Sequence, residues 1–124
     1  MPEGPILKRR QMVEVVSENP GTLLLAGGTW MSPRETDTKG YHIISGGASA
    51  DQPGFLILYF GRVPGVPIMS LVFGMVADSI PGIFSVALPF WQVIPMPFVS
   101  VGFLNTGVVQ QTSFDLYIEA RNTS

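Results

Sequence analysis

Apolar residues fill the second half of the chain, and they occur in short runs that proline and glycine interrupt. Between Val63 and Phe114 the only charged residue is Asp78. Pairs of glycines, or proline followed by glycine, are typical of turns. Such pairs occur at 20–21, 27–28, 46–47, 53–54, 64–65 and 81–82. They divide the sequence into pieces of strand length, and none of these pieces keeps a helical period.

Two segments near the C-terminus show the alternation of a strand with one buried face. Apolar and polar residues alternate over 114–119, and larger and smaller residues alternate over 98–103. The run Phe55–Phe60 does not alternate, which predicts a strand buried on both faces. The alternating residues 114–119 belong to the segment Thr112–Ala120. The other segments of strand length are Gln11–Glu18, Thr22–Ala26, Tyr41–Ser45, Ile68–Ala77, Ile83–Leu88 and Gln92–Ile94.

Two polar or glycine-rich segments are predicted to lack strand structure. Trp30–Lys39 is polar and predicts a loop, and Gly46–Ala50 predicts a flexible turn. About eight short strands with frequent turns indicate an all-β, antiparallel β-sandwich or jelly-roll-like domain, with a small β-barrel as the alternative. We expect one domain over residues 1–124, in which residues 1–10 form a polar N-terminal arm.

Composition narrows the classes of function. The chain has 124 residues, a mass of 13.4 kDa, a net charge of −2 and only 13% charged residues. Its charge gives no reason to expect nucleic-acid binding. Because it has no cysteine, disulfides, thiolate nucleophiles and cysteine-ligated metals are excluded. The N-terminal segment lacks the apolar core of a signal peptide, so secretion by that route is not expected.

The uncharged stretch Gly82–Leu104 has the length of a transmembrane helix. However, it contains Pro89, Pro95 and Pro97, and each interior proline costs a helix about 3 kcal/mol. No cluster of Lys or Arg flanks the segment. We therefore expect strands broken by prolines, and no membrane span.

No constellation of residues indicates catalysis, a metal or another cofactor. His42 is the only histidine, and no nucleophile motif accompanies it. Glu35, Asp37 and Asp51 lack the spacing of a calcium loop. The glycine-rich segment at 46–50 lacks the lysine of a phosphate-binding loop. We therefore expect a protein that is not an enzyme.

The candidate contact residues are large apolar side chains in the uncharged half. They are Phe90, Trp91, Met96, Phe98, Met69 and Phe73. Trp91 lies between two prolines, where a strand must bend or run along an edge, and it is our first choice for an interface anchor. If Trp91 is peripheral, the contact face is expected around Val66–Met75.

The basic cluster Lys8, Arg9 and Arg10 is a candidate for a second kind of contact, made by the N-terminal arm to an acidic neighbour. We expect that deletion of residues 1–10 leaves the fold intact and weakens partner binding.

Strands with so few charges must point apolar residues outward, and exposed apolar patches normally mark protein contacts. In this general character the chain resembles small all-β structural proteins of bacteriophage particles, such as capsid decoration (cement) proteins and head or tail appendages. The shared features are a short cysteine-free β chain, low charge, many Gly and Pro residues, a polar N-terminal arm and a C-terminal strand. No specific motif carries the resemblance, so no functional residue is transferred.

The resemblance implies a non-enzymatic role, symmetric homo-oligomers and attachment to a capsid lattice, and therefore location in the virion. Closed symmetry favours a trimer or another cyclic oligomer. If the chain is not of phage origin, we expect a cytoplasmic protein. The alternative function is a binding module whose barrel or sandwich encloses an apolar ligand.

Overall fold

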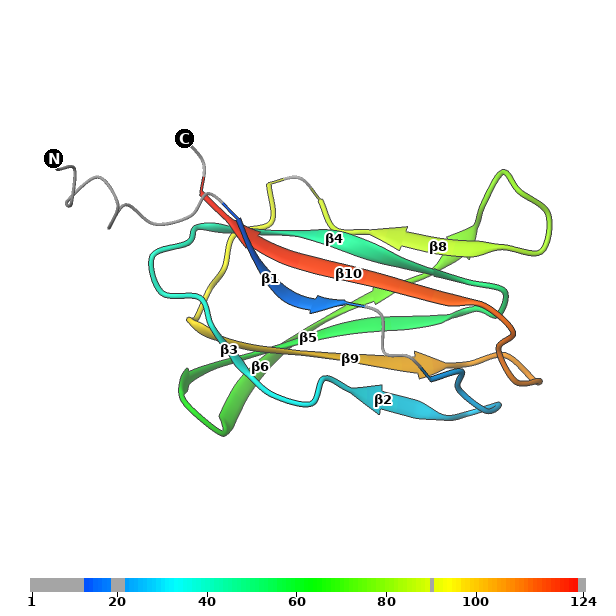
Figure 1. The fold of residues 1–124 in the computed structure, drawn as a ribbon, viewed down its shortest axis with the longest axis horizontal. Helices are drawn as coiled ribbons and strands as arrows, with labels where there is room; N and C mark the ends of the chain where they lie inside the picture. Colours follow the sequence, from blue (N-terminus) through cyan, green and yellow to red (C-terminus); the bar gives the residue numbers. More distant parts are fainter. Residues whose placement is uncertain (1–12, 19–21, 90, 123–124) are drawn as a thin grey trace, which may run out of the picture.

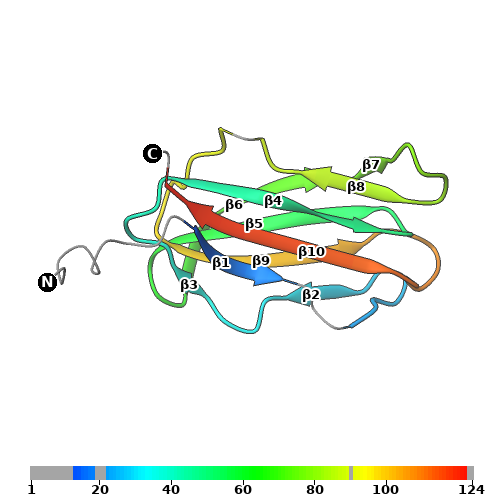
Figure 2. The same ribbon diagram turned by 45° about the horizontal axis from the view of Figure 1, so that its top comes forward.

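Two antiparallel sheets pack face to face in the computed structural model, which describes residues 13–18, 22–89 and 91–122 (Figures 1 and 2). Sheet A has the strand order β1 (Val13–Glu18), β10 (Phe114–Arg121), β4 (Ile43–Ala50), β8 (Phe84–Ala87) and β7 (Val76–Ala77). Sheet B has the order β2 (Thr29–Met31), β9 (Phe98–Asn105), β5 (Gly54–Val63) and β6 (Val66–Gly74), and β3 (Thr36–Asp37) also pairs with β9. The predicted all-β sandwich is confirmed, and the sheets do not close into a barrel.

The strand order is that of a jelly roll. When the two-residue strands β3 and β7 are set aside, eight strands remain. The first of them pairs with the last, the second with the seventh, the third with the sixth and the fourth with the fifth. A long hairpin that rolls up on itself gives this pairing and the two-sheet jelly roll. The sequence predicted about eight strands, and the described residues form ten because β3 and β7 are too short to leave a pattern.

Inward-facing residues of both sheets form one core. The alternation predicted for the two C-terminal segments is confirmed, since Val99, Val101 and Phe103 on β9 and Leu116 and Ile118 on β10 are buried. The core residues are Val16, Leu24, Ile44, Ala48, Leu56, Leu58, Phe60, Leu88, Val99, Val101, Phe103, Leu116, Ile118 and Ala120. These side chains fill the space between the sheets.

The prediction that Phe55–Phe60 is buried on both faces was wrong. Leu56, Leu58 and Phe60 are fully buried, but Phe55 is 40% exposed, and Ile57 and Tyr59 are half-buried. The strand is apolar on both sides although only its inner side meets another layer. Its apolar outer side is the first sign of an unpartnered surface.

The turn predicted at Gly46–Gly47 was also wrong, because both glycines lie inside β4. Gly46 has a φ of +125°, and a Cβ atom there would lie 2.0 Å from the backbone oxygen of Tyr117 on β10. A Cβ on Gly47 would lie 2.1 Å from the backbone oxygen of Val86 on β8. Only glycine permits such close approach of neighbouring strands, so these residues serve strand packing and not a turn.

Smaller differences concern irregular segments. The predicted loop Trp30–Lys39 overlaps the end of β2 and contains β3. Thr22–Ala26 is not a strand, although Leu24 hydrogen-bonds to Gln111 through both backbone groups. Gln92–Ile94 forms only an isolated bridge, from Val93 to Ile43.

The uncharged stretch Gly82–Leu104, which has the length of a transmembrane helix, forms β8 and nearly all of β9. Among the described residues there is no helix long and apolar enough to cross a membrane.

Candidate interaction surface

The outer face of sheet A is charged along its strand β10, with the exposed Val15 on β1 and Val76 on β7 toward its margins. Asp115, Tyr117, Glu119 and Arg121 point outward from β10, as the alternation of that strand requires. The Glu119 carboxylate accepts a hydrogen bond from the Ser45 hydroxyl at 3.3 Å and lies 3.7 Å from Nε of Arg121. This face has the composition of an ordinary water-exposed sheet surface.

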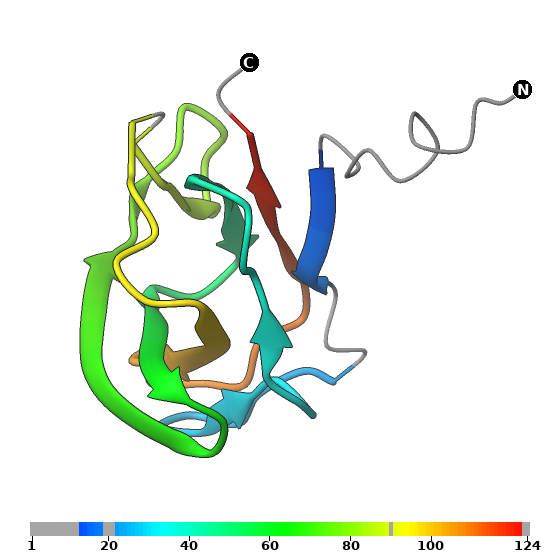
Figure 3. The same ribbon diagram turned by 90° about the vertical axis from the view of Figure 1, so that its left-hand side faces the viewer.

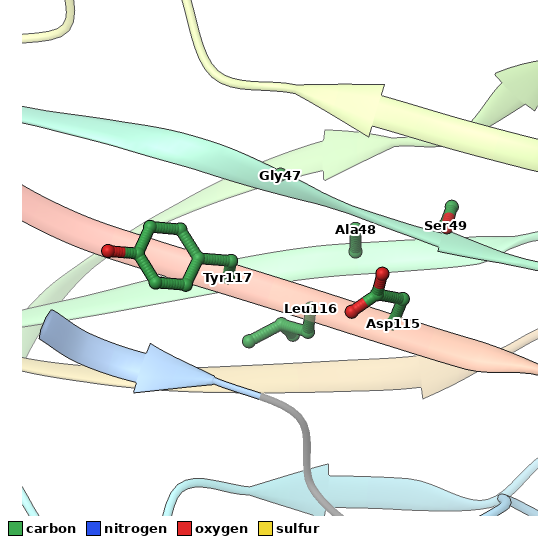
Figure 4. Close-up of a pocket in the computed structure, with 6 residues that line it drawn as sticks. All are labelled: Gly47, Ala48, Ser49, Asp115, Leu116 and Tyr117. Carbon is green, nitrogen blue, oxygen red and sulfur yellow. The ribbon is translucent and has the colours of Figure 1, made fainter.

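A shallow hollow lies on this charged face (Figure 4). Gly47, Ala48 and Ser49 of β4 and Asp115, Leu116 and Tyr117 of β10 line it. Gly47 is directly opposite Tyr117 in the ladder, and Ser49 is opposite Asp115. The hollow therefore arises because Gly47 has no side chain to fill the space beside the tyrosine ring.

The outer face of sheet B differs sharply. We call it the apolar face and define it as the outward residues of β2, of 100–104 on β9, of 55–59 on β5 and of 68–74 on β6. Its members are Thr29, Met31, Ser100, Gly102, Leu104, Phe55, Ile57, Tyr59, Ile68, Ser70, Val72 and Gly74. None of them is charged, and charge is found beyond one end of this face, where Asp37 on β3 is paired with Phe98. An antiparallel sheet with one face in water normally alternates apolar and polar residues, so an uncharged outer face indicates that another surface covers it.

Glycine at position 74 leaves the apolar face flat at this point, because it has no side chain that projects from the sheet. Phe55 on β5 is paired with Gly74 on β6, and a Cβ atom on Gly74 would lie 3.3 Å from the Phe55 ring. The ring therefore lies against the glycine and stays 40% exposed. A shallow hollow farther along the same two strands is lined by Tyr59, Pro67, Ile68, Met69 and Ser70.

Strand β6 is the exposed edge of sheet B. It pairs with β5 on one side, and no described strand lies on the other, as the end-on view in Figure 3 shows. It carries no charged residue, and Ile68 and Val72 are each 58% exposed. Edge strands are commonly protected by lysine, by proline or by a bulge, and β6 has only Pro67 and a bulge near its first residues. The stretch from Met69 to Gly74 is a regular, unprotected edge.

A second, smaller apolar patch lies at the margin of sheet A. Trp91 lies in the turn that follows β8 and is 60% exposed, and Val93 beside it is 61% exposed. The backbone of this segment is held against the start of β4, since the Ile94 N–H donates to the oxygen of His42 at 2.9 Å. Trp91 is therefore presented outward by a fixed backbone.

The predicted contact residues do not form one cluster. Met69 and Phe73 lie on β6 on the side that faces the core, where Phe73 packs against the core and Met69 stays 37% exposed at the edge. Met96 packs against the core and lines a hollow with Lys39 and Tyr41 at one end of the sandwich. Phe98 lies on β9, with Nζ of Lys39 5.3 Å from its ring centre. Phe90 lies outside the described residues, as do Lys8, Arg9 and Arg10.

The sequence missed the residues that dominate the apolar face, namely Phe55, Ile57, Tyr59 and Leu104. Phe55, Ile57 and Tyr59 were assigned to a strand buried on both faces, because a run of apolar residues looks the same whether its second face is covered or exposed. Leu104 lies just after the segment 98–103, for which one buried face was predicted. The available signal was the lack of charge from Val63 to Phe114, which indicated a surface of this kind without placing it.

The polar residues weighed for chemistry lie apart or serve structure. His42 is exposed just before β4. Asp37 accepts a hydrogen bond from the backbone of Lys39, and Glu35 accepts one from the backbone of Gly65. Within the described ranges, no group of three or more His, Asp or Glu residues could hold a metal ion.

Asp51 links two loops at one end of the sandwich. Its carboxylate accepts hydrogen bonds from the Thr112 hydroxyl at 2.6 Å, the Thr112 N–H at 2.8 Å and the Ser113 N–H at 3.1 Å. Desolvation, the largest single influence, acts to raise the pKa of Asp51, but these hydrogen bonds together outweigh it and lower the pKa below its usual value. The residue is a structural tie between the β4–β5 loop and the segment that leads into β10.

No protein family matches this chain, and neither a characterised protein nor a solved structure is detectably similar to it.

Proposed function

We propose that this chain is a non-enzymatic structural subunit, which forms a symmetric homo-oligomer and attaches to a larger protein assembly such as a bacteriophage capsid. The observation that carries the proposal is the contrast between the two outer faces of the sandwich. The outer face of sheet A has Asp115, Glu119 and Arg121 on its strand β10, whereas the twelve residues of the apolar face on sheet B include no charged residue, and charge such as Asp37 lies beyond its end. This distribution of charged residues is expected for a subunit with one face exposed to water and the other covered by another protein.

The fold is compatible with this role. Two-sheet jelly rolls build viral capsid proteins, and they also build lectins and cupins, so the choice among these roles rests on the surface and not on the topology. The Trp91 and Val93 patch lies on sheet A, away from the apolar face in the strand order. Two separate apolar surfaces suit a subunit that contacts both its own copies and a lattice.

The alternative function, a module that encloses an apolar ligand, has less support. The side chains of the core fill the space between the sheets, and Leu56, Leu58, Phe60 and Phe103 are among the largest of them. The hollows on the outer faces of the two sheets are shallow, and the one beside Met96 lies at one end of the sandwich.

The test is the mass of the native particle. We expect sedimentation equilibrium and native mass spectrometry of the full chain at micromolar concentration to show a closed oligomer. A monodisperse monomer of 13.4 kDa up to about 100 µM would overturn the proposal, because apolar interfaces of standard size bind far more tightly than this.

The capsid part of the proposal has its own test. The oligomer should co-sediment with capsids purified from the source of the chain and stripped of minor proteins. If a stable oligomer forms but does not bind such capsids, the assembly role stands and the virion role is rejected.

A further inference from the structure

We infer that two copies of this chain join by antiparallel pairing of their β6 strands, so that sheet B continues across the interface as one sheet. This inference rests on the proposed assembly function and specifies the contact through which the oligomer forms. It follows from the unpaired backbone groups of β6, from the absence of charged residues on this strand and from the exposed apolar side chains that it carries.

The backbone of β6 has hydrogen-bonding groups that no described strand uses. The Met75 N–H donates to the Gly54 oxygen at 2.9 Å, and the register between β5 and β6 is regular from Phe55 opposite Gly74 to Phe60 opposite Met69. In an antiparallel ladder, hydrogen-bonded and non-bonded pairs alternate. The backbone groups of Leu71 and Phe73 therefore point to β5, whereas those of Ser70 and Val72 point to the free edge.

The occupant that suits this edge is a second β6. A free edge is satisfied by another strand, and antiparallel pairing of identical edges about a two-fold axis is self-complementary. Because β6 carries no charged residue, two copies meet without like-charge repulsion and without desolvating an ion. An axis close to Ser70 and Val72 places exposed apolar side chains, such as Ile68 and Val72, beside those of the partner copy.

The consequence is a wider apolar face. Pairing through β6 places the apolar faces of two copies side by side on one continuous sheet, with Phe55, Ile57 and Tyr59 of each copy on the same side. A contact of β6 with β6 is two-fold, so it builds dimers or assemblies of dimers, instead of the trimer that the sequence favours. The joined face then offers a large uncharged surface to a third protein.

Cysteine cross-linking tests the contact directly, because the natural chain has no cysteine. Opposite residues of an antiparallel pair have Cα atoms about 4.5–5.5 Å apart, within the range that a disulfide spans. The variants are Ser70→Cys, Val72→Cys and an equal mixture of the two, and the control is Ser113→Cys, an exposed residue outside both sheets. Under mild oxidation of dilute protein, we expect rapid dimer cross-linking in at least one of the three samples and at least about tenfold slower cross-linking in the control.

A lysine on the edge gives the second readout. Val72→Lys should raise the dissociation constant of the dimer by at least about tenfold while circular dichroism and the melting temperature stay close to those of the natural chain. One result would overturn the β6 contact and leave the assembly function standing. In that result the natural chain is oligomeric, Val72→Lys does not weaken the oligomer, and none of the three cysteine samples cross-links faster than the control. If the natural chain is monomeric, both are overturned.

Discussion

The ring of Tyr59 on β5 lies against Gly102 on the neighbouring strand β9. A Cβ atom on Gly102 would lie 3.0 Å from Cε2 of Tyr59 and 3.0 Å from Sδ of Met31 on β2. Gly102 is buried although it faces outward, because these two side chains cover it from both sides. Aromatic cover of a strand glycine strengthens a sheet and leaves its outer surface flat and apolar. This is how the apolar face is continuous across three strands.

Charge on the apolar face should block assembly without unfolding the subunit. We expect Tyr59→Lys to shift the oligomer or its bound complex toward the free subunit, with loss of about 2 kcal/mol or more of association energy, because a lysine must be desolvated there. Sedimentation velocity measures the shift. The matched control is Tyr117→Lys on the charged outer face of sheet A, which should assemble normally. Equal effects of the two substitutions would contradict the assignment of the apolar face.

Alanine substitutions of Trp91 and Trp30 should differ in their effects on stability and assembly, because only Trp91 is a surface residue. Trp91 is 60% exposed, whereas Trp30 is partly buried and packs against the core. We expect Trp91→Ala to change the free energy of unfolding by less than about 1 kcal/mol and to weaken assembly, and Trp30→Ala to cost about 3 kcal/mol of stability. Chemical denaturation and sedimentation measure the two effects. If Trp91→Ala assembles as tightly as the natural chain, the Trp91 patch is not a contact.

Gly46 should tolerate a side chain far less than Gly65 does. Both have positive φ, but a Cβ on Gly46 would collide with the Tyr117 backbone, and nothing lies within 4 Å of one on Gly65. We expect Gly65→Ala to cost about 1 kcal/mol from backbone strain alone, and Gly46→Ala at least about 2 kcal/mol more, because β4 and β10 must separate. Urea denaturation compares the two variants. Similar losses in both would show that β4 and β10 are not in close contact at this point.

The stability of the chain should depend on Asp51 in acid. Hydrogen bonds from Thr112 and Ser113 hold the pKa of Asp51 below its unfolded value. The unfolded state therefore binds the proton first, and the stabilisation is fully present above about pH 4 and is lost as pH falls through the lower folded pKa. The contribution is less than about 1 kcal/mol, since water reaches the carboxylate.

Asp51→Asn should therefore unfold more readily than the natural chain at pH 7, and the difference should shrink as the pH falls below about 4. Thermal melts at a series of pH values measure this difference. A difference that is constant with pH would assign the effect to changed hydrogen-bond geometry instead of charge.

Local pattern alone determined the class of the fold and its best strands. The segment Phe114–Arg121 alternates between apolar and polar residues because one side of β10 packs on the core and the other faces water. The polarity of each residue therefore shows which side of the strand it occupies. The absence of charge from Val63 to Phe114 likewise required an uncharged surface somewhere on the molecule. The proline-broken apolar segments were recognised as strands because proline cannot sit inside a helix at low cost.

Only the tertiary structure decided which surface is bare. The outer side of Phe55–Phe60 is as apolar as its buried side, so no local pattern distinguishes a covered strand from one whose second layer is absent. The role of Gly46 and Gly47 in strand contact was equally hidden, since their neighbours, Tyr117 and Val86, are far away in the sequence. The position of β6 at the edge depends on how the whole hairpin rolls up. Pairing partners, layers and edges are non-local properties, and they exist only once distant segments have met.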